Sequence, residues 1–146
     1  MTGVPALRKA IADKAAALYD AVYDPETEVT VTSGATEALY AAITAVVQPG
    51  DDVVIVEPAY DAYAPVVTLN GGRPVYRQMK YPDYRIDWDE IGDAVTEKTA
   101  LVILNSPHNP TGMNLGTEDI AALEAIAHGF AGFPVDHEIR LVSSTW

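Results

Sequence analysis

The segment at residues 105–112, with the sequence NSPHNPTG, carries side chains suited to holding a ligand. Its two prolines fix φ and push the preceding residues out of helical geometry, while Gly112 permits a turn that other residues resist. Asn109 therefore presents a carboxamide, able to donate or accept a hydrogen bond, from a rigid loop. Because the apolar run at residues 100–104 precedes it, we expect Asn109 beyond the carboxyl end of a strand, where open α/β sheets bind ligands.

A second group with binding chemistry is the sequence SGATEA at residues 33–38, between a short β-branched run and a helical pattern. The free backbone amides of this segment, together with its two hydroxyls, could hold a phosphate at the positive end of a helix. The alternative is ordinary capping by Ser33, with Glu37 near the first turn. The spacing matches neither the dinucleotide-binding glycine pattern nor the Gly-Lys-Ser/Thr loop, so neither dinucleotide nor nucleoside triphosphate binding is supported.

An aromatic ring completes the set of candidate residues. Tyr60 lies just past the apolar run at residues 53–56, where a flat ring could stack on a flat ligand. Packing with the hydroxyl toward solvent is the alternative for this tyrosine. His108 has no second ligand or carboxylate at metal spacing, so we interpret it as part of the loop structure and predict no metal site.

Hydrophobic periodicity defines the elements that must position these residues. Helices are predicted over residues 6–22, 35–46, 60–69 and 88–95 and from residue 117 onward; strands are predicted at residues 29–32, 53–56, 73–77 and 100–104, with a further one at 139–142. Asp87, with Glu90 three residues later, and Thr117 are expected to cap their helices.

The alternation of strands and helices predicts an α/β fold, a three-layer α/β/α arrangement with a mostly parallel sheet. In such a sheet the ends of the strands at residues 29–32, 53–56 and 100–104 would bring the phosphate-binding turn, the ring and the amide to one edge.

Composition narrows the class of protein. The 146 residues suit a single domain, and a formal net charge of −12 opposes binding to a phosphate backbone, so we expect no nucleic-acid partner. No apolar run reaches the roughly 18 residues of a membrane span. The first residues lack a basic segment followed by an apolar stretch, which favours a cytoplasmic location. The chain has no cysteine, so thiolate chemistry and disulfides do not enter.

Four ordered motifs together carry a resemblance to a known family. They are PALRKAIA at residues 5–12, TSGATEAL at 32–39, EPAYDAY at 57–63 and NSPHNPTG at 105–112. The sequence resembles the large domain of class I/II aminotransferases, which are fold-type I enzymes that use pyridoxal phosphate. Within that family it is similar to the methionine and kynurenine aminotransferase branch.

The resemblance implies a role for each candidate residue. Gly34, Ala35 and Thr36 correspond to the turn that binds the cofactor phosphate, and Tyr60 corresponds to the aromatic residue that stacks on the pyridine ring. Asn109 corresponds to the asparagine that hydrogen-bonds the ring oxygen of the cofactor and helps to orient the substrate carboxylate. The implied partners are an amino acid and a 2-oxo acid, and the implied assembly is a homodimer.

The chain departs from the family pattern at the lysine that would bond covalently to the cofactor. Downstream of the NPTG motif no lysine matches it, and the four lysines present are read as solvated side chains: Lys9, Lys14, Lys80 and Lys98. Transamination needs this amine as a nucleophile and as a proton carrier, so we assign no catalytic residue and expect this chain to be inactive alone.

The pattern of the family is lost near the C-terminus. We therefore expect residues 1–128 to form part of an aminotransferase large domain and residues 129–146 to be an atypical C-terminal segment, the whole being a fragment. The alternative is a non-enzymatic α/β domain that binds a cofactor or a partner weakly.

Overall fold

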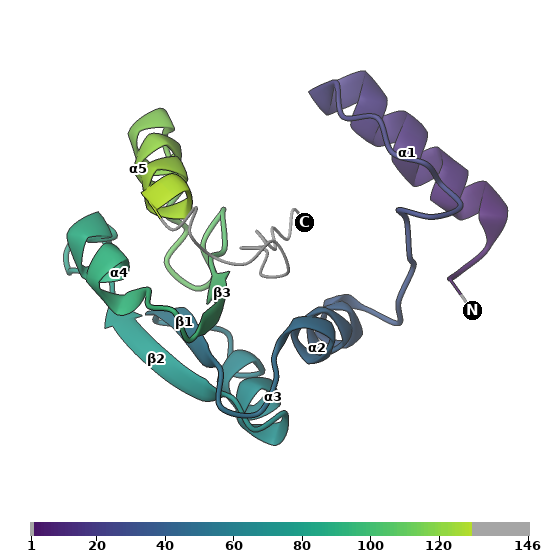
Figure 1. Ribbon diagram of the computed structural model, residues 1–146. Helices are drawn as coiled ribbons and strands as arrows, with labels where there is room; N and C mark the ends of the chain where they lie inside the picture. The colour runs from purple at the N-terminus through teal and green to yellow at the C-terminus, as the bar shows by residue number, and fades with distance from the viewer. Residues whose placement is uncertain (1, 130–146) are drawn as a thin grey trace. The chain divides into compact units, whose positions relative to one another are not determined.

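The computed structural model describes residues 2–129. The described elements, in chain order, are α1 (Pro5–Tyr19), α2 (Ala35–Val46), β1 (Asp52–Glu57), α3 (Tyr63–Leu69), β2 (Arg73–Gln78), α4 (Trp88–Ala94), β3 (Thr99–Ile103) and α5 (Thr117–Gly129) (Figure 1). The strand predicted at residues 139–142 and the C-terminal segment from residue 130 on lie outside the described residues.

The chain divides into two compact units, one ending at Ala38 and the other beginning at Leu39. The second unit contains a parallel sheet with the strand order β2-β1-β3. Val54 at the centre of β1 is in register with Val75 of β2 and Val102 of β3. The predicted parallel sheet is therefore confirmed.

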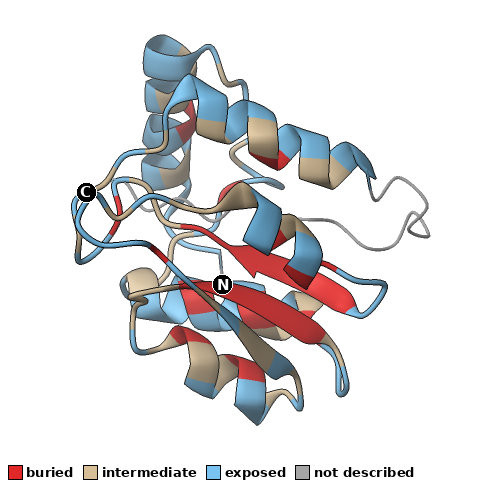
Figure 2. Ribbon diagram, turned by 90° about the vertical axis from the view of Figure 1, so that its left-hand side faces the viewer, coloured by how far each residue is buried: buried red, intermediate tan, exposed pale blue. Residues whose placement is uncertain are grey.

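Side chains of β1 alternate between two hydrophobic clusters, one on each face of the sheet. Val53 and Ile55 join residues of α2 and α3, whereas Val54 and Val56 join residues of α4 and α5. Figure 2 shows the resulting burial of the central strands beneath helices whose outer faces are exposed. Each buried valine or isoleucine contributes about 1.5–3 kcal/mol relative to an exposed one. This two-sided burial confirms the three-layer arrangement and explains why β1 is apolar throughout.

Local signals set several helix ends as predicted. Asp87 precedes α4 and accepts a hydrogen bond from the amide of Glu90 at 3.2 Å, as expected for its capping role. Pro5 occupies the first turn of α1, where its missing N–H costs nothing. Past the end of α2, Gly50 has a φ of 95°, a left-handed conformation that glycine adopts without strain.

Four predictions about elements are wrong. Helix α1 ends at Tyr19 instead of residue 22, because Asp20 takes a left-handed φ of 52°. Residues 29–32 form no strand: the amide of Val31 donates to the carbonyl of Thr2 at 3.0 Å, and the described residues supply no neighbouring strand to extend this bond into a ladder. Helix α3 begins at Tyr63 instead of Tyr60. Thr117 lies inside α5, because the Gly116 carbonyl accepts the first helical bond and Gly116 is the capping residue.

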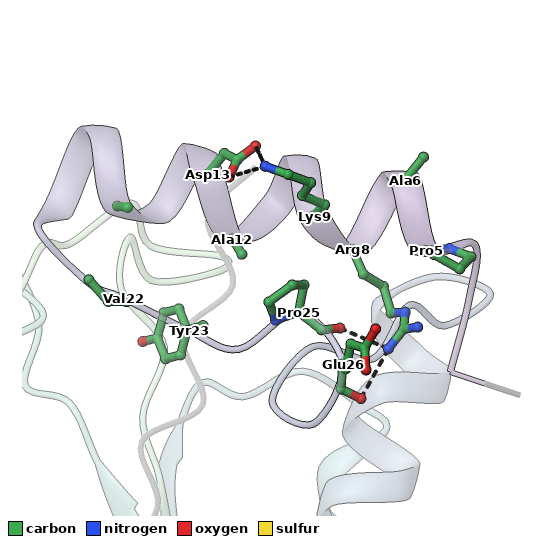
Figure 3. A pocket seen from close by; sticks show the side chains of 11 residues that line it. Pro5, Ala6, Arg8, Lys9, Ala12, Asp13, Val22, Tyr23, Pro25 and Glu26 are labelled. Carbon is green, nitrogen blue, oxygen red and sulfur yellow. Dashed lines mark hydrogen bonds and ion pairs between the residues drawn. The ribbon is translucent and has the colours of Figure 1, made fainter.

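The first unit is held together by Arg8 of α1. Its guanidinium donates to the carbonyls of Pro25 and Glu26 at 2.8 and 3.1 Å. A groove of about 560 Å³ lies between α1 and the segment at residues 22–26, and Figure 3 shows Arg8 reaching across it to these two carbonyls. Arg8, part of the first resemblance motif, therefore has a structural role here.

Among the described residues, no helix combines the length and apolar character needed to cross a membrane.

Candidate functional site

The loops after β1 and β3 emerge at the same edge of the sheet, because the two strands are parallel neighbours. The loop after β1 carries Tyr60, and the loop after β3 carries Asn109. This edge is the carboxyl end of the strands, the position at which open α/β sheets bind ligands. Two of the three predicted binding features therefore lie on adjoining loops.

Hydrogen bonds within the loop after β3 hold it in one conformation. The Asn109 amide donates to Oδ1 of Asn105 at 2.8 Å. His108 donates its amide to the carbonyl of Met113 and accepts at its own carbonyl from the amide of Gly112, each at 2.7 Å. Gly112 has a φ of 75°, so the predicted glycine turn is present.

Asn109 projects from this loop with its carboxamide accessible. The residue is exposed, and no hydrogen bond joins its side-chain amide to any other residue in the described part of the chain. Its backbone, by contrast, is tied to Asn105. Because the backbone of Asn109 is fixed and its carboxamide is exposed, the carboxamide can donate to one ligand atom and accept from another.

The ring of Tyr60 is half-buried and packs against the hydrophobic cluster on one face of the sheet. The buried Tyr63 meets it edge to face, with ring centroids 5.8 Å apart and an interplanar angle of 77°. Burial raises the pKa of the Tyr63 hydroxyl, and the neighbouring Tyr60 adds to the shift. The contact orients the Tyr60 ring. Tyr60 therefore packs against the hydrophobic cluster, and the same packing fixes the orientation of its ring.

His108 is buried, with 5% of its surface exposed. Its Nδ1 lies 2.8 Å from Oγ1 of Thr111. Burial lowers the pKa of the imidazole, a shift that the nearby backbone of Pro58 partly opposes. The sequence prediction of a loop-structure role captured the contact within the loop. It missed the burial of the side chain, which no spacing in the sequence reveals.

The turn at Gly34 belongs to the first unit. Gly34 has a φ of 93°, and no heavy atom lies within 4 Å of the position that a Cβ would take. Its carbonyl accepts from the Ala38 amide at 3.3 Å, so Gly34 caps α2 and the alternative of capping by Ser33 is wrong. The carboxylate of Glu37 instead accepts the Ser33 amide.

The structure does not carry this turn on a strand of the sheet, because residues 29–32 are not a strand. We expected the ends of three strands to meet at one edge. Two of them do, at the loops of Tyr60 and Asn109, but the strand expected before Gly34 is absent. The amides of Gly34 and Ala35 still offer donors at the positive end of a helix of 12 residues.

All four lysines are exposed, as the sequence predicted for solvated side chains. Lys9 pairs with Asp13 at 2.7 Å, and Lys80 pairs with Asp87 at 2.6 Å and Glu90 at 3.2 Å. Over residues 2–129, no three side chains of histidine, cysteine, aspartate or glutamate gather as a potential metal site.

Comparison with known proteins agrees with the sheet, the two loops and the four motifs. The family model for aminotransferase class I and II matches residues 1–135. The chain belongs to this aminotransferase family. The resemblance predicted from the sequence motifs is thereby confirmed.

Individual relatives support the same assignment. A methionine aminotransferase of Escherichia coli K12 is 47% identical over 139 residues, which are 95% of this chain and 36% of that relative. A solved methionine aminotransferase structure from E. coli matches with a TM-score of 0.88 at 46% identity, covering 97% of this chain and 35% of that one. For N-succinyldiaminopimelate aminotransferase from Mycobacterium tuberculosis the TM-score is 0.86 at 40% identity, with 97% and 36% covered. The chain thus spans about a third of the length of its relatives.

Proposed function

We propose that this chain forms the cofactor-facing part of a pyridoxal phosphate-dependent aminotransferase. The complete enzyme would move an amino group between an amino acid and a 2-oxo acid, and this chain by itself would hold the cofactor without turnover. The observation that carries the proposal is that two loops, one bearing Tyr60 and the other Asn109, emerge together at the carboxyl edge of the sheet.

The turn at Gly34, Ala35 and Thr36 suits a phosphate group. The amides of Gly34 and Ala35 donate to no other residue among those described, and the helix dipole of α2 favours an anion there. Because a Cβ on Gly34 would meet nothing within 4 Å, the backbone is open to close approach by a phosphate oxygen.

Tyr60 and Asn109 suit the aromatic part of the cofactor. The Tyr60 ring, held edge-on by Tyr63, can stack on a pyridine ring. The exposed carboxamide of Asn109 can donate to a ring oxygen or to a substrate carboxylate. When bound, the cofactor supplies the electron sink that amino-group transfer needs, while these residues supply position and electrostatics.

Covalent attachment of the cofactor requires a lysine amine, and no lysine of this chain matches the position that the family uses. All four lysines are exposed, and Lys9 and Lys80 are paired with carboxylates. We therefore expect noncovalent binding of pyridoxal phosphate by this chain. Borohydride treatment followed by mass spectrometry checks this expectation: no stoichiometric covalent adduct should form, and one cofactor per chain fixed on a single lysine would contradict it.

Equilibrium dialysis with pyridoxal phosphate, and in parallel with pyridoxal, tests the proposal directly. Pyridoxal phosphate should bind more tightly, because pyridoxal lacks the group that the Gly34 turn would hold. Equal binding of the two compounds, or none, would overturn the assignment of the phosphate turn. A mixture of an amino acid, a 2-oxo acid and the cofactor should show no turnover with this chain, and robust turnover would contradict the expected inactivity.

Matched variants test the two loop residues. Tyr60→Leu should weaken binding of pyridoxal phosphate about fivefold through lost stacking, and Asn109→Ala should weaken it about tenfold through one lost hydrogen bond. Tyr76→Leu and Asn114→Ala remove exposed residues of the same types elsewhere and should leave affinity unchanged. Equal effects of the site and control variants would favour the rival function, a non-enzymatic α/β domain.

The proposed assembly is the homodimer implied by the family. Helix α1 exposes apolar side chains that a partner surface could cover, among them Leu18, 60% exposed, and Tyr19, 68% exposed. Light scattering on the purified chain measures the assembly directly. A monodisperse dimer supports the proposal, and a monodisperse monomer contradicts it.

A further inference from the structure

The side chain of Asn105 joins the backbone of Asn109 to the end of β3. Asn105 lies two residues past the end of the strand, after the buried Leu104, and its Oδ1 accepts the backbone amide of Asn109 at 2.8 Å. The residue after Asn109 is Pro110, which has no amide hydrogen to donate. Among the described residues, the backbone of Asn109 makes no other hydrogen bond. The position of Asn109 therefore depends on a side chain four residues earlier.

The backbone bonds that close the rest of the loop do not include Asn109. The amide of His108 donates to the carbonyl of Met113, and the amide of Gly112 donates to the carbonyl of His108, each at 2.7 Å. These bonds join residues 108–113 to one another and give that segment its turn. They do not connect it to the strand, whereas the bond to Asn105 starts from a residue beside the strand end.

We propose that Asn105 is a positioning residue that sets the place of the Asn109 carboxamide in the candidate site by accepting the Asn109 backbone amide. The inference rests on the proposed cofactor site, since the place of this carboxamide matters only when a ligand contacts it. The Asn109 side chain is exposed, so its position follows from that of its backbone. Asn105 thus acts on the ligand through Asn109.

Three variants separate this bond from a general effect on the loop. Asn105→Leu removes the acceptor oxygen and keeps a side chain of similar size, whereas Asn105→Asp retains an acceptor in the same place. The charge that Asn105→Asp adds confines this variant to measurements without cofactor. Ser106→Ala is the matched control, because Oγ of Ser106 accepts the Leu115 amide at 3.1 Å, a bond of the same kind in the same loop that does not involve Asn109.

Backbone order parameters from NMR, measured without cofactor, provide the first readout. The Asn109 amide should have an order parameter of about 0.85 in the native chain, Asn105→Asp and Ser106→Ala, and should fall below about 0.6 in Asn105→Leu. Equal order at Asn109 in Asn105→Leu and the native chain would overturn the inference. Hydrogen exchange in the native chain needs no variant to fold: an Asn109 amide that exchanges as fast as one in an unfolded peptide would also overturn it.

Binding of pyridoxal phosphate in a double-mutant cycle provides the second readout. Asn105→Leu should bind about fivefold more weakly than the native chain, while Ser106→Ala should stay within about twofold. Added to Asn109→Ala, the Asn105→Leu change should alter the affinity by less than about twofold, because the carboxamide through which Asn105 acts is already absent. A further loss of about fivefold in that background would show a general effect on the loop and would overturn the inference.

The two readouts separate this inference from the proposed function. If the native chain does not bind pyridoxal phosphate, the proposed function fails, while the order parameter of the Asn109 amide still decides whether Asn105 fixes that residue. If the native chain binds and Asn105→Leu binds equally well, the inference fails while the proposed function stands.

Discussion

Asp52 of β1 and Arg73 of β2 are partners in register and form an ion pair with two hydrogen bonds. Nε of Arg73 lies 2.7 Å from Oδ1 of Asp52, and a terminal guanidinium nitrogen lies 2.5 Å from Oδ2. The carboxylate is 4% exposed and the arginine side chain 70% exposed. The pair therefore anchors the first residues of two parallel strands while its cation remains hydrated.

Removing the Asp52 charge should destabilise the fold. Asp52→Asn keeps the shape but leaves one acceptor oxygen, so one bond is lost and the other loses its charge. The free energy of unfolding should fall by about 1–2 kcal/mol, because solvent screens the exposed guanidinium. Urea denaturation measures the loss. Asp13→Asn, which breaks an exposed pair with Lys9 on α1, is the control and should leave the midpoint unchanged. A midpoint equal to that of the native chain in Asp52→Asn would contradict the anchoring role.

The phosphate turn can be tested with two glycines of matching geometry. Gly34 and Gly50 have φ values of 93° and 95°, and a Cβ on either would meet nothing within 4 Å. Alanine at each position should cost about 1–2 kcal/mol of stability through backbone strain. Only Gly34→Ala should weaken binding of pyridoxal phosphate, by about tenfold, in equilibrium dialysis. Equal loss of binding in both variants would show that strain alone is responsible.

The space between Val47 and Val67 should be too small for a side chain at residue 72. A Cβ on Gly72 would lie 2.6 Å from Cγ1 of Val47 and 3.0 Å from Cγ1 of Val67, and both valines are buried. Gly72→Ala should therefore cost about 1–3 kcal/mol. Gly92→Ala in α4, whose Cβ would meet only Ile126 at 3.9 Å, should stabilise by about 0.5–1 kcal/mol. Thermal unfolding of both variants should show shifts of opposite sign.

His108 should make stability depend on pH below about 6.5. Burial lowers the pKa of its imidazole in the folded chain, so the unfolded chain binds more protons in that range. Its contribution to stability is full above the unfolded pKa and is lost as the pH falls through the lowered folded pKa. Between about pH 7.5 and about pH 5.5, the urea midpoint of the native chain should fall more than that of His108→Gln. Parallel curves would contradict the shift.

Helix α5 should depend on Asp119 for its attachment to α4. The Trp88 indole donates to Oδ1 of Asp119 at 2.9 Å, and the Gly116 amide donates to Oδ2 at 2.8 Å. These two bonds lower the pKa of the carboxyl, with that to Trp88 the larger cause. Asp119→Ala loses both bonds and should cost about 1–2 kcal/mol in urea denaturation. Asp119→Asn keeps one acceptor oxygen, so it retains one of the two bonds and should cost less than Asp119→Ala; an equal cost would contradict this account.

The sequence by itself determined the elements whose signals are local. Helix α2, strand β1 and the Asp87 cap of α4 follow from apolar spacing, turn residues and a side chain three residues from its donor. The four motifs were also sufficient to predict the family, because their order and residue types are read along the chain without reference to contacts. The roles of Gly34, Ala35, Thr36, Tyr60 and Asn109 remain predictions.

Only the tertiary structure decided the features that depend on partners distant in the chain. Residues 29–32 have the β-branched composition of a strand, yet a strand exists only where another segment completes its hydrogen bonds. The pairing of Asp52 with Arg73 required the register of β1 and β2. The burial of His108, which is 5% exposed, likewise required the packing of other segments around its loop.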